Sequence, residues 1–256
     1  MSQQLSEKNP HYTYSLVDKS EDLISNVSHN KNLIISYYIL EGTLNFFFKE
    51  KQHKVLKDNV IIISGLDKAK NFNLDINSKV LEIFSKQKNK QTLLVEDNKG
   101  VRSENIISDY RIFNIHKKVE KPWGYEVWYA WLKDYHVLKK IFMKKGNKCS
   151  LQYHNAKYET NFLVSGKAKI IKGLYIDLKE EREKTFQKIL STDLIKDYSS
   201  IHKAPYVFTN VPGEVHRVYS EADYVAYEVS TPELDDVVRV QDDKNRPSGL
   251  IIEEHK

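Results

Sequence analysis

The sequence predicts an all-β protein. Runs rich in Val, Ile, Tyr and Phe recur along the chain, and clusters of Gly, Asn, Asp and Lys separate them. This is the pattern of short strands joined by turns in a β-sandwich or barrel. Stretches with the 3.6-residue apolar period of a helix are few. The length of 256 residues allows one large or two small domains and a substantial buried core.

In the first third of the chain, the expected strands follow one another closely. Asn32–Leu40 is an apolar run, Glu41 and Gly42 follow as a turn, and Thr43–Phe48 returns along it. Two further strands are expected at Val60–Ile63 and Val80–Phe84. The residues therefore predict a β lobe in this part of the chain.

The segment from Ser85 to Glu120 is polar and mixed in composition. It predicts a crossover between two lobes rather than a regular sheet. One or two extra strands are expected within it, at Leu93–Val95 and Arg111–Ile115.

In the second half, Ser150–His154 is predicted to be extended, with a turn at residues 155–157 and a return strand over Glu159–Val164. Gly166 permits a tight turn because glycine tolerates positive φ, and Lys167–Ile171 is the next strand. A turn at Pro212-Gly213 precedes a strand over Glu214–Tyr219, and another is expected at Tyr224–Val229.

Four side chains in these strands form a candidate metal site. Alternate residues of a strand point to the same side, so Gln152 and His154 share a face, and the turn after them brings Glu159 beside His154. His216 follows on a later strand. Two His and one carboxylate are a recurrent facial set for divalent metals. Gln152 is either the fourth ligand or a group that orients another ligand.

An ordered series of motifs resembles a known family. The series begins with Lys121-Pro-Trp-Gly-Tyr125, Val137–Gly146 and Ser150-Leu-Gln-Tyr-His154, and continues with Glu159–Gly166. Glu228-Val and Asp235-Asp-Val-Val-Arg239 complete it. Together they resemble the type II mannose-6-phosphate isomerases of the cupin superfamily, which are also found fused to mannose-1-phosphate guanylyltransferases. The resemblance runs from about Val119 to Arg246.

The resemblance implies a bicupin, built from two double-stranded β-helix (jelly-roll) barrels with a small helical insertion. The order of strand, Glu-Gly turn and strand around Gly42 echoes Val164–Ile170. We therefore expect residues 1–100 to form a degenerate cupin-like lobe without metal ligands and residues 101–256 to form the metal-binding cupin domain. His29 and His53 are isolated and are expected at the surface.

The resemblance further implies a metal-dependent isomerase or epimerase acting on a sugar phosphate or a nucleotide sugar. His154, Glu159 and His216 would hold one divalent ion (Zn, Mn, Co, Ni or Fe), with Gln152 as fourth ligand. The implied catalytic residues are Arg239, Lys139 and Glu228, and the implied substrate contacts are Lys139, Arg239 and Trp123. Each has a structural alternative: a salt bridge to Asp235 or Asp236 for Arg239, solvent exposure for Lys139, hydrogen bonding in the core for Glu228, and packing of the barrel end for Trp123.

Two other functions stay open. The two-His, one-carboxylate set also suits an Fe(II)-dependent dioxygenase, and a cupin can bind carbohydrate without catalysis. The stretch from Gly173 to Tyr206 is much longer than the short hairpin of the family, and the segment from Glu228 to Asp235 is altered. The substrate is therefore expected to be a different sugar from that of the isomerases.

The long stretch contains the one clear helix signal. Asp177 and Glu180 have the spacing of a capping box, and the residues up to Leu190 predict a short charged helix with Leu178, Phe186 and Leu190 on one side. Such an insertion is either a lid over the barrel mouth or an elaboration of the surface or of a dimer contact.

Composition and charge limit the remaining classes of function and location. The formal charge of +5 is spread along the chain, which favours either anionic small molecules or simply a solvated lysine-rich surface; no nucleic-acid module is recognised. Cys149 is the only cysteine, which excludes an internal disulfide. Neither a leader at Met1–Pro10 nor a long apolar run is present, so a cytoplasmic protein without membrane association is expected. The expected assembly is a homodimer.

Overall fold

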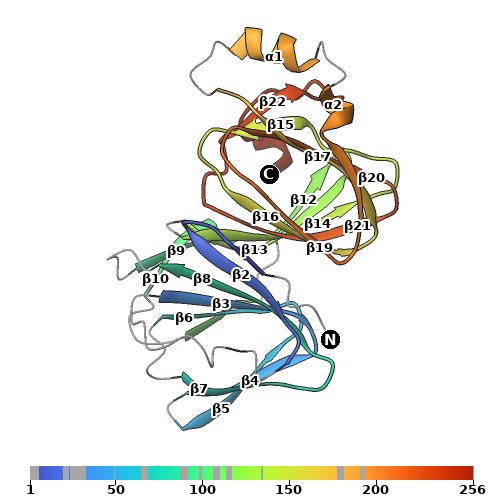
Figure 1. Ribbon diagram of the computed structural model, residues 1–256. Helices are drawn as coiled ribbons and strands as arrows, with labels where there is room; N and C mark the ends of the chain where they lie inside the picture. Colours follow the sequence, from blue (N-terminus) through green and yellow to red (C-terminus); the bar gives the residue numbers. More distant parts are fainter. Residues whose placement is uncertain are drawn as a thin grey trace. The chain divides into compact units, whose positions relative to one another are not determined.

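The computed structural model describes residues 6–19, 23, 33–48, 50–64, 69–86, 92–97, 100–105, 110–113, 117–133, 135–177, 182–190 and 194–255. The predicted all-β class is confirmed, because strands dominate these residues and the helices are short (Figure 1). The chain divides into two compact units. Unit 1 comprises Met1–Lys117 and Trp128–Leu138, and unit 2 comprises Lys118–Val127 and Lys139–Lys256.

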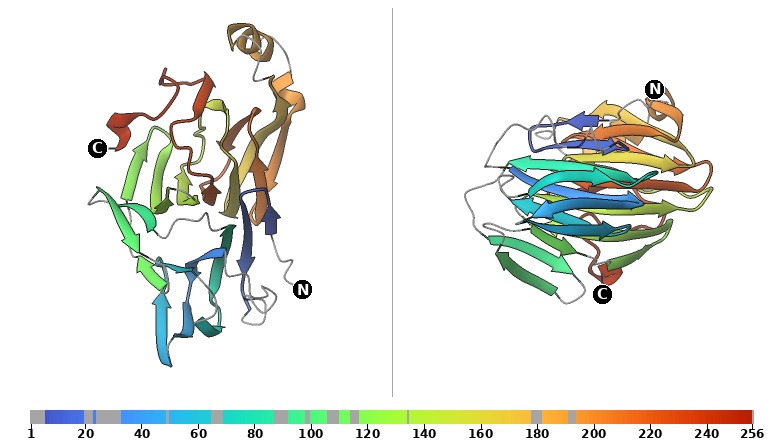
Figure 2. Two further views of the ribbon diagram at one scale, coloured as in Figure 1. Left: turned by 90° about the vertical axis from the view of Figure 1, so that its left-hand side faces the viewer. Right: turned by 90° about the horizontal axis from the view of Figure 1, so that it is seen from below.

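Unit 1 contains a six-stranded and a three-stranded antiparallel sheet. The larger sheet has the order β1 (Ser6–Lys8), β2 (Tyr12–Val17), β8 (Lys79–Lys86), β3 (Leu33–Glu41), β6 (Val60–Ser64) and β11 (Tyr110–Phe113). The smaller has the order β5 (Lys51–Leu56), β4 (Thr43–Phe48) and β7 (Ala69–Leu74). Figure 2 shows the same strands from two other directions.

The core of unit 1 lies between these two sheets. Apolar side chains from both sheets meet there, including Ile35 and Ile39 of β3, Leu44 and Phe46 of β4, and Ile61 of β6. All five are fully buried. Residues 34–40 of β3 are all buried, which explains their mostly apolar composition, because a strand with both faces buried has no solvent side to fill with polar residues.

Unit 2 also contains two facing sets of strands. One sheet has the order β18 (Ser199–Lys203), β17 (Lys167–Tyr175), β20 (Glu214–Ser220), β15 (Leu151–His154) and β22 (Val237–Gln241). In the other, the consecutive neighbours are β14 (His136–Met143), β21 (Tyr224–Ser230), β16 (Glu159–Ser165) and β19 (Tyr206–Asn210). A core containing Leu163, Ile170, Phe208 and Ala226 joins the two sets.

Strand registers identify unit 1 as a second copy of the unit 2 architecture. Tyr37 of β3 is paired with Glu82 of β8, and Asn161 of β16 is paired with Glu228 of β21. Tyr37 and Asn161 each lie five residues before the turn glycine that ends the strand, Gly42 or Gly166. Both glycines have positive φ, at 70° and 96°. This correspondence confirms the bicupin architecture.

The same alignment shows how the copies differ. Glu159 lies seven residues before Gly166, and the residue seven before Gly42 is Ile35. The position of the candidate ligand Glu159 in unit 2 is therefore occupied by an apolar residue in unit 1. His53 of β5 stacks on Phe46, with the ring centroids 5.2 Å apart, and His29 lies outside the described residues.

The structure contains the two strands expected between the lobes, at Leu93–Val95 and Arg111–Ile115, and two further strands that were not expected. β9 (Thr92–Asp97) and β10 (Gly100–Asn105) pair as an antiparallel hairpin. β11 pairs with β6, and β12 (Lys117–Lys121) pairs with β13 (Gly124–Leu132). Strands of mixed polarity escape a search for apolar alternation, because pairing satisfies the backbone groups whatever the side chains are.

The helical insertion is confirmed, but its packing differs from the expectation. α1 (Arg182–Leu190) is followed by α2 (Leu194–Asp197). Ile189 of α1 is buried, whereas Leu190 is exposed. Leu178 and Glu180 of the predicted capping box lie outside the described residues. In the described part of the chain, no helix has both the length and the apolar character needed to span a membrane.

α1 covers the outer face of the β15 sheet. Phe186 meets Tyr153 edge to face, with the ring centroids 6.5 Å apart, and both pack in a cluster with Ile189 and Val215. Tyr153 alternates with Gln152 along β15, so the two point to opposite faces. Figure 1 shows α1 outside the strands of unit 2. The described helix is therefore a surface element and does not cover the barrel interior as a lid.

Candidate metal centre

Three of the four predicted ligands come together inside unit 2. The candidate ligand atoms of His154, Glu159 and His216 all lie within 4.8 Å of one another. His154 Nε2 is 3.4 Å from Glu159 Oε2, and His216 Nε2 is 3.2 Å from Glu159 Oε1. All three residues are at most 5% exposed. Within the described residues, this is the one group of His, Cys, Asp and Glu side chains that meets these criteria.

Strand pairing explains this convergence. His154 ends β15 and Glu159 begins β16, so the chain reverses within four residues between them. β20 runs beside β15 with His216 directly opposite Gln152, and residues opposite each other in an antiparallel pair share a face. In addition, the backbone N–H of Gly213 donates to the carbonyl of His154 at 2.8 Å.

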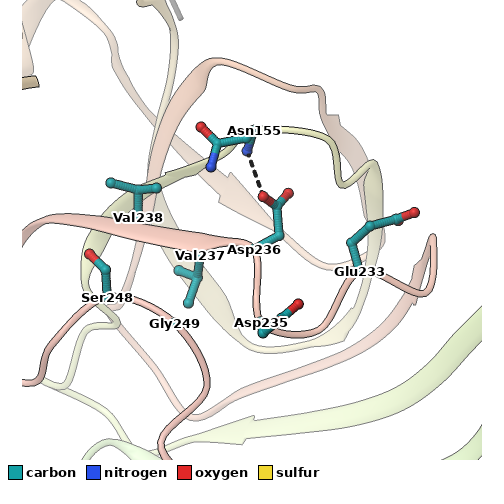
Figure 3. A pocket seen from close by; sticks show the side chains of 8 residues that line it. All are labelled: Asn155, Glu233, Asp235, Asp236, Val237, Val238, Ser248 and Gly249. Carbon is teal, nitrogen blue, oxygen red and sulfur yellow. Dashed lines mark hydrogen bonds between the residues drawn. The ribbon is translucent and has the colours of Figure 1, made fainter. Parts of the chain in front are cut away.

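The turn between the first two ligands is fixed by Asp236. Its carboxylate accepts backbone N–H groups from Asn155, Ala156 and Lys157 at 3.2, 2.8 and 2.8 Å. Figure 3 shows Asp236 directed at the backbone nitrogen of Asn155, in an acidic pocket of about 450 Å³. Three accepted bonds use much of the capacity of this carboxylate, so its structural task is to hold the turn.

Both imidazoles are prepared for metal binding. His216 Nδ1 lies 2.9 Å from the carbonyl oxygen of Glu214, and a carbonyl can only accept, so Nδ1 carries a proton and Nε2 is the nitrogen directed at Glu159. Among the described residues, neither ring nitrogen of His154 has a hydrogen-bond partner, although both are buried. Burial and the nearby charge of Lys157 lower the pKa of His154, which favours the neutral, ligating form.

Glu159 is held as a carboxylate by two donors. Lys157 Nζ donates to Oε2 at 2.7 Å, and Asn210 Nδ2 donates to Oε1 at 2.9 Å. Burial acts to raise the pKa of Glu159, but Lys157 and the two histidines outweigh burial and lower this pKa well below its ordinary value. Neither Lys157 nor Asn210 belongs to the ligand set predicted from the sequence. Both lie in segments flanking the ligands, and their residue types alone carry no signal of this contact.

Gln152 lies beside the three candidate metal ligands. Its side-chain nitrogen is 3.4 Å from His216 Nε2, and its oxygen accepts a hydrogen bond from the Ser150 hydroxyl. A half-turn of the amide exchanges the two atoms, and the hydroxyl then accepts instead of donating. The carboxamide oxygen can therefore face the three donors without loss of the bond to Ser150.

Two of the three predicted catalytic residues adjoin this group. Glu228 Oε1 accepts from Lys157 Nζ at 3.0 Å, and Lys139 Nζ is 3.5 Å from the same oxygen. Lys139 is also 3.6 Å from Glu126 Oε2. These side chains are almost completely buried, so Lys139 faces the interior. Buried charges are tolerated when they are paired in this alternating way.

Arg239 has a different environment. It is opposite Gln152 in the β15–β22 register, but its guanidinium donates to the carbonyls of Pro247 and Gly249. Arg239 Nε lies 4.0 Å from Asp242 Oδ2, so the acidic group beside it is Asp242 rather than Asp235 or Asp236. The guanidinium is therefore engaged with the chain segment that follows β22.

Trp123 packs in the core of unit 2 and is 7% exposed. It also borders a cavity of about 210 Å³. The same cavity is lined by Ser150, the residue bonded to Gln152, by the carboxylates of Asp242 and Asp243, and by three cationic side chains. These cations are Lys148, Lys244 and Arg246.

The donors fit a divalent cation. Two imidazoles and a carboxylate match the nitrogen and oxygen preferences of Zn, Mn, Co, Ni and Fe, and a facial arrangement leaves positions for exogenous ligands. The unpartnered, buried nitrogens of His154 are the observation that supports this fit, since buried polar atoms ordinarily have a partner.

Comparisons with known proteins agree with this description. Residues 108–212 match the family model described as mannose-6-phosphate isomerase C-terminal. A structure of Bacillus subtilis oxalate decarboxylase, reported for its Mn(II) centres, aligns with a TM-score of 0.51 and 10% identity over 93% of this chain and 78% of that one. A structure of Lactobacillus farciminis oxalate decarboxylase in complex with formate aligns with a TM-score of 0.51 and 10% identity, over 93% of this chain and 86% of that one.

A putative glyoxylate-induced protein from Pseudomonas aeruginosa gives a TM-score of 0.53 and 10% identity over 90% of this chain and 78% of that one. At such identities the similarity concerns the fold. No curated protein matched the sequence. The resemblance read from the motifs is thus confirmed at the level of the fold: this chain has the bicupin fold, and its residues 108–212 match the mannose-6-phosphate isomerase C-terminal family model.

Proposed function

We propose that this protein is a metal-dependent isomerase or epimerase that acts on a sugar phosphate or a nucleotide sugar. The observation that carries the proposal is the buried group of His154, Glu159 and His216, which adjoins the Glu228–Lys139 pair. The match of residues 108–212 to the mannose-6-phosphate isomerase C-terminal family supports the reaction class.

Aldose–ketose isomerisation moves a proton between adjacent carbons through an enediolate. His154, Glu159 and His216 would hold a divalent ion, which would supply Lewis-acid stabilisation of the charge that develops on the substrate oxygens. We assign the proton transfer to Glu228. Its Oε1 accepts from Lys157 at 3.0 Å, which leaves Oε2 to exchange a proton with the substrate.

The charges of the interior favour an anionic intermediate. Three carboxylates, of Glu126, Glu159 and Glu228, are paired with the two ammonium groups of Lys139 and Lys157. This gives one net negative charge, and a bound dication changes it to one net positive charge. An enediolate oxyanion is stabilised in such a preorganised, buried environment.

We further propose that the cavity next to Trp123 admits the substrate. Lys148 and Arg246 are paired there with Asp243 and Asp242, at 2.8 and 2.7 Å. Lys244 also lines the cavity and suits the phosphate of a sugar phosphate or nucleotide sugar, because ammonium groups bind phosphate oxygens. Trp123 also lines this cavity. The Arg239 guanidinium is engaged with two carbonyls, so its expected contribution is to hold the segment that borders this region.

The decisive experiment is an anaerobic screen of sugar phosphates and nucleotide sugars with protein reconstituted separately with Zn, Mn, Co, Ni and Fe(II). Turnover in D₂O is expected to place deuterium on the carbon that exchanges its proton, detected by mass spectrometry. Glu228→Gln is expected to retain the metal and to lose at least about 100-fold in rate, the usual contribution of a general base.

Two results would contradict the proposal. Oxygen consumption with Fe(II), without isomerisation under anaerobic conditions, would identify a dioxygenase. Tight binding of a sugar ligand with no turnover under any metal would identify a carbohydrate-binding cupin.

A further inference from the structure

We propose that Glu214 is a positioning residue for the metal centre, which fixes His216 by anchoring the turn before it. The inference rests on the proposed metal site and adds a residue that acts through a ligand. Glu214 is the first residue of β20 and is 1% exposed. A carboxylate buried this deeply requires partners for its oxygens.

The partners of the Glu214 carboxylate are backbone groups from two separate segments. Oε1 accepts the N–H of Gly173 at 2.9 Å, and Oε2 accepts the N–H of Val211 at 3.2 Å. Lys172 Nζ lies 3.4 Å from Oε1 and also donates to the carbonyl of Thr209 at 2.9 Å. The side chain therefore ties the end of β17 to the turn that precedes His216.

The backbone of β17 is shaped to make this contact. Its register with β20 shifts between Ile171 and Leu174, which is the signature of a β-bulge that redirects local groups. Gly173 lies within the bulge and has φ of 92°, a conformation that glycine adopts at little cost. The bulge leaves the Gly173 N–H without a ladder partner, and the Glu214 carboxylate accepts it.

The backbone of the same turn orients both imidazoles. The carbonyl of Glu214 accepts from His216 Nδ1 at 2.9 Å, which sets the tautomer and the ring angle. The N–H of the preceding residue, Gly213, donates to the carbonyl of His154 at 2.8 Å. Movement of this turn therefore changes the geometry of two ligands at once.

A residue that orients a metal ligand without itself binding the metal affects metal affinity as well as folding. Groups that orient ligating histidines commonly contribute about 10–100-fold to metal affinity. Val215 provides a matched control, because it is the next residue and is fully buried. It packs on the outer face of the sheet with Tyr153 and Ile189, away from His216.

The test is titration of the metal-free protein with Co²⁺, followed by visible absorption and by calorimetry. The Co²⁺ band reports the geometry of the ligands independently of activity. Glu214→Ala is expected to raise the Co²⁺ dissociation constant about 10–100-fold and to shift the band. Val215→Ala is expected to lower the thermal midpoint while leaving the dissociation constant and the band unchanged.

Glu214→Gln provides a second variant in case the alanine protein does not fold. The amide has the size of the carboxylate and retains one acceptor oxygen, so the Gly173 bond survives and the Val211 bond is lost. We expect a dissociation constant raised several-fold with a smaller band shift. Values equal to wild type in the folded Glu214 variants would overturn the inference.

Equal changes of the Co²⁺ dissociation constant in Val215→Ala and Glu214→Ala would also overturn the inference, because the loss of affinity would then follow the loss of stability alone. Failure of the wild-type protein to bind Co²⁺ would overturn the metal site itself, together with this inference. Co²⁺ binding by wild type without sugar turnover would contradict the proposed function while leaving the role of Glu214 intact.

Discussion

Replacing Lys157 by methionine tests whether the buried charges of unit 2 depend on one another. The ammonium group lies 2.7 Å from Glu159 Oε2 and 3.0 Å from Glu228 Oε1, and burial excludes water from all three groups. Removing one partner of a buried ion pair costs about 3–5 kcal/mol because the remaining charge is left uncompensated.

The expected loss is large enough to measure in the metal-free protein. For a unit of this size, 1 kcal/mol corresponds to about 3–5 °C, so the thermal midpoint of unit 2 should fall by about 10–20 °C. The assay is thermal and urea unfolding at pH 7 with a chelator present, followed by circular dichroism.

An exposed pair with the same separation provides the control. Lys167 Nζ is 2.7 Å from Glu221 Oε2, but these side chains are 39% and 25% exposed. Such pairs contribute about 0–1 kcal/mol because water and salt screen them. Lys167→Met should therefore change the midpoint little. A loss below about 1 kcal/mol for Lys157→Met, or an equal loss for both variants, would refute the argument from burial.

Three further predictions follow from the site and the core. His154→Ala and His216→Ala should each sharply reduce the metal content of the purified protein, measured by elemental analysis, whereas His53→Ala should leave it unchanged; equal loss in all three would contradict the ligand assignment. Burial lowers the pKa of His136 to about 3, below its unfolded value of about 6.5, so its stabilising contribution is complete above pH 6.5 and declines as the pH falls. Between pH 7 and pH 5 unfolding by urea should show a loss of about 2 kcal/mol from this residue, and His136→Asn should remove most of that slope. Glu228→Gln should retain wild-type Co²⁺ binding in calorimetry while abolishing deuterium exchange into substrate; loss of the metal would show a ligand role instead.

The convergence of the candidate ligands was predictable because strand geometry is local. Alternation places Gln152 and His154 on one face, and the short turn to Glu159 limits where the carboxylate can lie. Gly166 marks the end of the strand, since the turn there has φ of 96°. In a motif of this kind, the backbone geometry of a few consecutive residues determines where the side chains lie.

The electrostatic partners of the site were not predictable in the same way. Lys157 appears in the sequence as one polar residue in a turn, and Glu228 follows 71 positions later. Their contact depends on which strands become neighbours in the folded barrel. The side of the sheet that α1 covers was likewise undetermined, because Phe186 and Ile189 indicate an apolar face without indicating what they cover.

The sequence by itself determined the β class, the duplicated order of strands and the grouping of the metal donors, since periodicity and turn residues act over a few positions of the chain. Tertiary structure alone decided which charges share the interior and which backbone groups hold the ligands. Buried carboxylates such as Glu159, Glu214 and Glu228 are stable only with partners that the chain brings from distant strands. Those partners follow from the pairing of β15, β16, β20 and β21, which no single segment encodes.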